Sequence, residues 1–217
     1  MQLAVTIDVE ARDHPCVPGN FRRMVDTLVE AAVPTTLFVQ GGWLEERATE
    51  DEIAALRAPG MVVGLHSQTH RRFTTLTPPE IATEFAASEA ALERRGIPPV
   101  RPLFRFPHLD GNTDRPRLAA VEALGWTHVD CHAIAYDWDD GLREQPEQVA
   151  QHLIDDIDAR RVTGHDTAIV MIHSWPDPTP RAVRLLLDYA ARSGDRFVAL
   201  TEIPVGEWRA PGAPATA

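Results

Sequence analysis

The chain has 217 residues, of which 44% are hydrophobic and 24% charged, and its formal net charge is −11. These values are ordinary for a globular protein, and the length suits one domain with a sizeable core. The acidic balance argues against a nucleic-acid partner or an anionic membrane surface, because both require a basic footprint.

Short apolar, β-branched runs alternate with longer amphipathic segments along the chain. The predicted strands cover residues 3–8, 35–39, 61–65, 103–106, 127–131, 168–172 and 197–200. The predicted helices cover residues 21–32, 78–96, 114–125, 146–161 and 180–194, with a shorter one over 49–58. This alternation predicts an α/β fold of parallel strands joined by right-handed crossovers. Strands buried on both faces suit either a small barrel or an open doubly wound sheet.

Ionisable residues stand at the carboxyl ends of most predicted strands, where α/β folds of both kinds place their chemistry. The first strand ends in TIDVE, which puts Asp8 and Glu10 two residues apart. In an extended chain both side chains point to the same side. Two carboxylates so close repel each other unless a cation lies between them. The alternative interpretation is one acid near solvent and one that caps a helix.

The third strand leads into GLHSQTH, which contains His66 and His70. Two imidazoles and one carboxylate make up the three protein ligands of a typical catalytic zinc site, and the second carboxylate then remains as a general base. The spacing of four is weak evidence by itself, because it also occurs on helix surfaces. Gly64 and the preceding strand-like run disfavour a helix here.

Three further strand ends carry candidate residues. FRFPH offers Arg105, which could orient a carboxylate or simply lie at the surface before a turn. YDWDD offers Asp137 and Trp138, either as a pocket wall or as a loop with a half-buried indole. VMIHSW offers His173, which is a core histidine if unpaired and a general acid if a carboxylate supports it.

Taken in order, T-I-D-V-E, H-S-Q-T-H, R-F-P, D-W and I-V-M-I-H resemble the five motifs of the polysaccharide deacetylase family. This is the NodB-homology group, carbohydrate esterase family four, and the resemblance runs from about residue 3 to residue 203. It implies a distorted (β/α)7 barrel and the metal-dependent removal of an N- or O-acyl group. We expect one such domain over residues 1–208 and a disordered Pro/Ala-rich tail over 209–217.

The resemblance also implies roles for individual residues. Asp8 matches the catalytic base, and Arg105 matches the arginine that orients it. Asp137 matches the acid that tunes the catalytic histidine, and His173 matches that histidine, the general acid. The two histidines of H-S-Q-T-H match the metal ligands.

The chain departs from the common family pattern at two places. The usual first motif has a second aspartate as metal ligand, where this chain has Val9; it is closer to the D-x-E branch, which includes allantoinase-like members. Glu10 is therefore the predicted third ligand, with Asp13 and His14 as alternatives. The usual third motif ends in Tyr-Gly, where this chain has His108 and a leucine, and the backbone N–H of His108 is a candidate oxyanion donor.

The predicted activity is metal-dependent hydrolysis of an N-acetyl or O-acyl group on a carbohydrate or amino sugar, with release of acetate. Zinc is the expected metal, and cobalt or another divalent ion stays open. Trp138, His108 and Trp175 are the predicted contacts with a saccharide or small-molecule substrate. Two alternatives remain at this point: an allantoinase-like amidohydrolase acting on a linear or cyclic amide, and a non-catalytic barrel.

The sequence also gives expectations about location and partners. No apolar run approaches the roughly 20 residues needed to cross a bilayer. The first ten residues lack a basic region and a long apolar region, so no signal peptide is expected. We therefore expect a cytoplasmic protein with no nucleic-acid or membrane partner, and its oligomeric state is left open.

Overall fold

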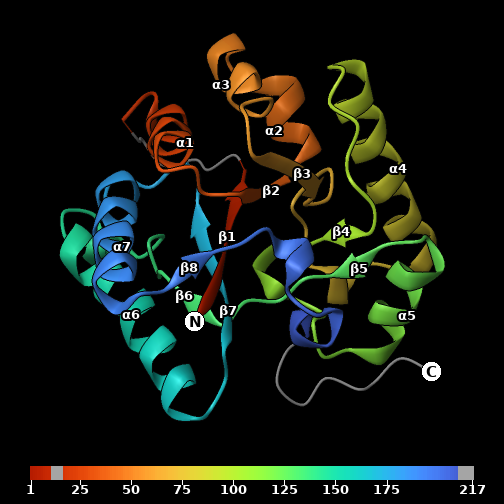
Figure 1. Cartoon of the computed structure of the whole chain (residues 1–217). Coiled ribbons are helices and arrows are strands. Elements are labelled where there is room, and N and C mark those ends of the chain that lie inside the picture. Colours follow the sequence, from red (N-terminus) through yellow and green to blue (C-terminus); the bar gives the residue numbers. More distant parts are fainter. Residues whose placement is uncertain (11–16, 210–217) are drawn as a thin grey trace.

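A curled parallel sheet lies at the centre of the molecule, with helices around its outside (Figure 1). The computed structural model describes residues 1–10 and 17–209. Within them the sheet has eight strands in the order β5-β4-β3-β2-β1-β7-β6, and β8 also pairs with β1. The strands are β1 (Gln2–Val9), β2 (Thr35–Val39), β3 (Met61–Leu65), β4 (Leu103–Phe104), β5 (Thr127–His128), β6 (Ala133–Ile134), β7 (Thr167–His173) and β8 (Arg196–Phe197).

The helices follow the strands in the alternation that the sequence predicts. They are α1 (Asn20–Glu30), α2 (Gly41–Glu46), α3 (Glu50–Ala55), α4 (Pro78–Arg94), α5 (Arg115–Ala123), α6 (Pro146–Val162) and α7 (Thr179–Ser193). Local chemistry sets their ends: the Thr77 N–H donates to the Glu80 carboxylate at 2.8 Å where α4 begins. Gly194, with φ of 73°, ends α7 in the left-handed conformation that glycine tolerates. None of the described helices is long and apolar enough to cross a membrane.

Alternate residues of the central strands face two different cores. In β1, Leu3, Val5 and Ile7 pack under the helices, whereas Ala4 faces the inside of the curled sheet. The inner cluster consists of Ala4, Phe38, Leu103, Val129, Ile169, Val198, Leu200, Ile203 and Trp208. Ala4, Leu103 and Ile169 lie near the amino ends of their strands, and Val198, Leu200, Ile203 and Trp208 of the C-terminal segment belong to the same cluster. The inside of the carboxyl half is left for polar side chains.

These observations confirm the predicted α/β class and agree with a distorted (β/α)7 barrel. β5 and β6 form the two edges of the sheet, so the barrel is not closed by a strand pair there. Three predicted strands are shorter than expected: residues 103–106 and 127–131 contain only the two-residue strands β4 and β5, and of residues 197–200 only Phe197 belongs to a strand, β8. Beyond β5 the backbone bonds elsewhere, as the Asp130 N–H shows by donating to the Trp208 carbonyl at 2.7 Å.

The sequence pattern does not predict β6 or α2. β6 has two residues, too few for any periodicity to show. α2 begins with Gly41 and Gly42, which in a sequence indicate a turn. The structure gives the reason for these glycines, because an added Cβ at Gly41 would lie 2.1 Å from the Gln68 side chain and one at Gly42 would lie 2.7 Å from the Gln68 carbonyl oxygen. The tail predicted to be disordered lies outside the described residues from residue 210 on.

Gly64 in β3 provides a test of how closely the inside of the sheet is packed. A Cβ there would lie 2.7 Å from the Leu103 carbonyl oxygen and 3.0 Å from the Phe38 ring. We expect Gly64→Ala to lower the free energy of unfolding by about 2 kcal/mol, as overpacking does in cores. Urea unfolding followed by circular dichroism measures this. Gly206→Ala is the control, since nothing lies within 4 Å of its added Cβ; equal midpoints for both variants would contradict the prediction.

Candidate active site

A cavity of about 340 Å³ opens at the carboxyl ends of the strands. It is lined by Asp8, Glu10, His66, His70, Arg72, His108, Leu109, Ile134, Tyr136, Trp138, Met171 and His173. Asp8 and His173 are register partners on the neighbouring strands β1 and β7, so they lie side by side at the carboxyl ends of these strands. The strand ends that the sequence singled out therefore converge on one site.

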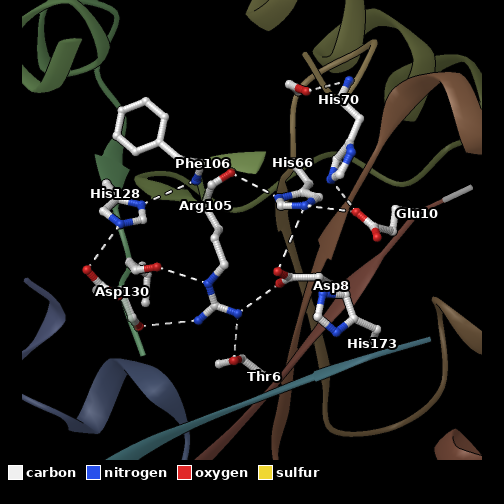
Figure 2. A network of polar contacts seen from close by, with 12 residues as sticks. Thr6, Asp8, Glu10, His66, His70, Arg105, Phe106, His128, Asp130 and His173 are labelled. Carbon is white, nitrogen blue, oxygen red and sulfur yellow. Dashed lines mark hydrogen bonds and ion pairs between the residues drawn. The ribbon is translucent and has the colours of Figure 1, made fainter. Parts of the chain in front are cut away.

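Glu10, His66 and His70 form a cluster whose candidate ligand atoms all lie within 4.8 Å of one another. Glu10 directly follows β1, and the histidines flank the loop after β3 (Figure 2). His66 Nε2 is 3.5 Å from Glu10 Oε2, and His70 Nε2 also contacts that oxygen. Burial raises the pKa of Glu10, but contact with the two histidines that face its carboxylate holds it well below its ordinary value.

The donor set of this cluster suits a divalent metal. His66 Nδ1 lies 3.0 Å from the Arg105 carbonyl oxygen, which can only accept a hydrogen bond. In neutral His66 the proton is therefore on Nδ1, and Nε2 turns a lone pair toward Glu10. Glu10 Oε2 is buried and has no hydrogen-bond partner among the described residues. Lone pairs that face each other in this way need a cation between them, and two imidazoles with one carboxylate are the ligands that zinc takes.

The loop that carries the two histidines is held from α4. Glu84 is 7% exposed, and its Oε2 accepts hydrogen bonds from the N–H groups of Gln68 at 2.9 Å and Thr69 at 2.8 Å. Its Oε1 accepts the Thr69 hydroxyl at 2.6 Å. His70 has a φ of 59°, a conformation that costs free energy and persists only where the surroundings impose it. Glu84 was not predicted as a functional residue, because in the sequence it occupies a helical pattern like any solvent-facing acid.

Asp8 is held by a guanidinium that lies wholly inside the sheet. Arg105 Nη1 donates to Asp8 Oδ1 and to the Thr6 hydroxyl, both at 2.8 Å, and Nε donates to the Val129 carbonyl at 3.0 Å (Figure 2). Burial raises the pKa of Asp8, but the Arg105 charge and hydrogen bond, with nearby histidines, bring it below its ordinary value. Asp8 is thus ionised, and its other oxygen, Oδ2, lies 3.9 Å from His66 Nε2.

A second buried pair supports the segment that holds Arg105. Asp130 accepts hydrogen bonds from the Cys131 N–H at 2.8 Å and the Asn112 amide at 3.0 Å, and its carboxylate lies 3.7 Å from His128 Nε2. Its backbone carbonyl accepts from Arg105 Nη2 at 3.3 Å. Burial lowers the pKa of His128, which leaves this imidazole neutral. His128 was not singled out from the sequence, because a histidine inside an apolar strand is most often structural.

His173 and Asp137 form a hydrogen-bonded pair on the other side of Asp8. His173 Nδ1 is 2.8 Å from Asp137 Oδ1, and Asp137 Oδ2 accepts from the His173 N–H and the Thr179 hydroxyl. Burial lowers the pKa of His173, but the charge and hydrogen bond of Asp137 outweigh it and raise the pKa to about 9. The Asp137 contact fixes Nδ1, so Nε2 is the nitrogen left to exchange a proton.

The predicted substrate contacts have different positions. His108 and Trp138 line the cavity, and the Trp138 ring stands edge-on to His173 with centroids 5.1 Å apart. Trp175 is not among the described residues that line the cavity; its indole N–H donates to Glu10 Oε1 at 3.3 Å. A substrate contact for Trp175 stays a prediction. The alternative ligands Asp13 and His14 lie outside the described residues.

Arg72 and Tyr136 also line the cavity and were not predicted from the sequence. Arg72 lies two residues after His70, so proximity to a motif was the available signal. Tyr136 directly precedes the D-W pair and has a φ of 51°, a backbone state that the sequence does not reveal.

The sequence and the fold are similar to those of known proteins. A family model described as polysaccharide deacetylase matches residues 2–129. No curated protein matches the sequence. Among solved structures, a family 4 carbohydrate esterase from Streptomyces lividans in complex with acetate has 22% identity and a TM-score of 0.71, over 98% of this chain and 97% of that one.

Two further structures show the same fold. Peptidoglycan deacetylase PdaC from Bacillus subtilis has 17% identity and a TM-score of 0.72, over 94% of this chain and 89% of that one. A CE4 family pseudoenzyme from Bacillus anthracis has 22% identity and a TM-score of 0.74, over 96% of this chain and 66% of that one. At these identities the likeness shows a shared fold.

The hydrogen bonds between Glu84 and the loop that carries the two histidines lead to a prediction about metal affinity. Glu84→Gln replaces a carboxylate that accepts from two backbone N–H groups and a hydroxyl. We expect zinc to bind about 10–100-fold more weakly, the range seen when a supporting residue behind metal ligands is removed. Isothermal titration of metal-free protein with zinc measures it. Glu93 is exposed on the same helix, and Glu93→Gln is the matched control. Identical zinc affinities for both variants would show that Glu84 does not support the metal ligands.

Proposed function

Because this chain belongs to the polysaccharide deacetylase family, we propose that it is a metal-dependent deacetylase that hydrolyses the N-acetyl group of an amino sugar or related small saccharide and releases acetate. The observation that carries this proposal is the pairing of a base and an acid beside a metal-suited cluster. Arg105 lowers the pKa of Asp8 and keeps it ionised, and Asp137 raises the pKa of His173 and keeps it protonated. Both Asp8 and His173 line the cavity that also contains Glu10.

Glu10, His66 and His70 are the residues that would hold the metal, and we propose zinc. When bound, a divalent zinc ion supplies Lewis-acid polarisation of the acyl carbonyl and lowers the pKa of water. The chain's own contribution is to present three ligands from a rigid setting. His66 is oriented by the Arg105 carbonyl, and the His70 backbone N–H donates to the Ser67 hydroxyl at 3.1 Å.

Asp8 acts as the general base in this proposal. Its Oδ2 takes a proton from water while Oδ1 stays bonded to Arg105. The water oxygen then forms a bond to the acyl carbon. The backbone N–H of His108 at the cavity wall is the proposed donor to the developing oxyanion, an interaction that typically contributes several kcal/mol to transition-state stabilisation.

His173 acts as the general acid. Its Nε2 donates a proton to the leaving nitrogen as the carbon–nitrogen bond breaks, which gives acetate and a free amine. The Asp137 carboxylate at 2.8 Å keeps the imidazole protonated and correctly turned. Base and acid thus start in opposite protonation states, as hydrolysis of an amide requires.

The cavity supports a small substrate. Its volume of about 340 Å³ is at the lower end of the range for small-molecule sites. Tyr136 and Trp138, with ring centroids 5.4 Å apart, offer aromatic surface of the kind that packs against a sugar ring. The family match favours deacetylation over the opening of a cyclic amide. One neighbour in fold is described as a pseudoenzyme, so the acid and base, rather than the fold, support catalysis here.

The proposal is tested by acetate release from N-acetylglucosamine and its short oligomers. We expect the zinc-loaded protein to release acetate and the Asp8→Asn variant to lose about 10²–10⁴-fold in kcat/KM, since proton transfer to a positioned base contributes that much. His66→Ala should lose both activity and zinc. Asp139→Asn, an exposed acid outside the cavity, is the control. Turnover near the wild-type value in Asp8→Asn would rule out the assigned base.

The acid makes a separate prediction about pH. A general acid works only when protonated, and the pKa of His173 is raised to about 9. We therefore expect kcat/KM to be constant below this pKa and to fall as the pH rises through it. In Asp137→Asn the raising charge is gone and burial remains, so the alkaline limb should move down by roughly 1–2 pH units. Rate profiles from pH 6 to 10 measure this, and an unmoved limb would contradict the assignment.

A further inference from the structure

Most ionic groups that line the cavity already have an ionic partner, either in the cavity wall or just behind it. Asp8 is paired with Arg105 at 2.8 Å, and His173 is paired with Asp137 at 2.8 Å. Glu10 faces the two histidines of the metal cluster. A substrate that enters the cavity therefore meets these charges in balanced groups, and they offer little to a charged substituent remote from the acyl group.

Arg72 is a different kind of lining residue. Its side chain is 61% exposed, and its Nη1 lies 3.6 Å from Asp110 Oδ1. That separation exceeds hydrogen-bond length, so the guanidinium keeps N–H donors available for another acceptor. Asp110 is itself occupied by Thr74, whose N–H and hydroxyl donate to Oδ2 at 2.7 and 2.8 Å. Asp110 thus orients Arg72 through one end of the guanidinium, and the remaining N–H donors of its five can bind another acceptor.

The position of Arg72 puts its charge on the metal side of the cavity. It follows His70 by two residues, and the His108 ring lies against His70 with centroids 4.4 Å apart. Arg72 is thus a permanent cation on this wall of the cavity. It stands out in a chain whose net charge of −11 would otherwise disfavour an anionic ligand.

We propose that Arg72 binds an anionic group, a carboxylate or a phosphate, carried by a small N-acylated substrate. This inference rests on the proposed deacetylase function and adds the chemical class of the substrate. A guanidinium binds both groups through paired N–H donors, and such charge-assisted bonds are stronger than neutral ones. Arg72 is then a specificity-determining residue that takes no part in the proton transfers.

The neighbouring arginine provides a matched control. Arg71 is 52% exposed and lies 3.6 Å from Glu80, and it does not line the cavity. Binding of N-acetylglucosamine, N-acetylglucosamine 6-phosphate and N-acetylmuramic acid is measured by isothermal titration to the wild type, Arg72→Gln and Arg71→Gln. Each titration is run on zinc-loaded and chelator-treated protein, because phosphate can itself bind a metal. Acetate release from all three compounds is measured in parallel.

We expect at least one anionic sugar to bind the wild type and Arg71→Gln about tenfold more tightly than the neutral sugar, with or without zinc. In Arg72→Gln this preference should disappear while the affinity for the neutral sugar stays the same. The two anions show whether phosphate or carboxylate is preferred. No preference in the wild type, or a preference that survives in Arg72→Gln, overturns the inference. Absence of acetate release with an intact preference instead overturns the proposed function and leaves an anion-binding site.

Discussion

The buried guanidinium of Arg105 is the interaction on which the rest of the site depends. A charge inside a protein is tolerated only when it is paired and its donors are satisfied. Asp8, Thr6 and two backbone carbonyls supply these acceptors. The same residue's carbonyl accepts the hydrogen bond that orients His66. One residue on the segment after β4 therefore fixes both the proposed base and a proposed metal ligand.

Arg105 also explains why the barrel can remain incomplete. The sheet ends at β5 on one side and at β6 on the other, so the carbonyls of Val129 and Asp130, just past β5, have no neighbouring strand. Arg105 donates to both of them. Below this point the Asp130 N–H bonds to the Trp208 carbonyl, and the C-terminal segment fills the apolar half. The opening between the edge strands β5 and β6 is thus filled by apolar packing around Trp208 at one end. At the other end, next to the proposed active site, the Arg105 side chain fills it.

Much of this arrangement could be predicted from the sequence because it depends on local patterns. The period of two in β1 predicts that Asp8 and Glu10 share a face, and the two residues do line one cavity. The alternation of strands and helices predicts the convergence of their carboxyl ends. The supporting residues could not be predicted in this way. Glu84 and His128 act through side-chain contacts across 15 to 22 residues, and only the packing of α4 and β5 reveals which groups they meet.

The departure from the common first motif has a structural explanation in the same period of two. Val9 belongs to the cluster beneath the helices and is fully buried there, so its side chain is committed to the outer core. Glu10 lies on the cavity side, one strand repeat beyond Asp8, and its longer side chain reaches the two histidines. Its two oxygens are used differently: Oε1 accepts the Trp175 indole N–H, and Oε2 faces the imidazoles. Trp175 therefore fixes the rotation of the carboxylate and turns the other oxygen toward the proposed metal, which is how a D-x-E sequence can provide both a base and a ligand from one strand.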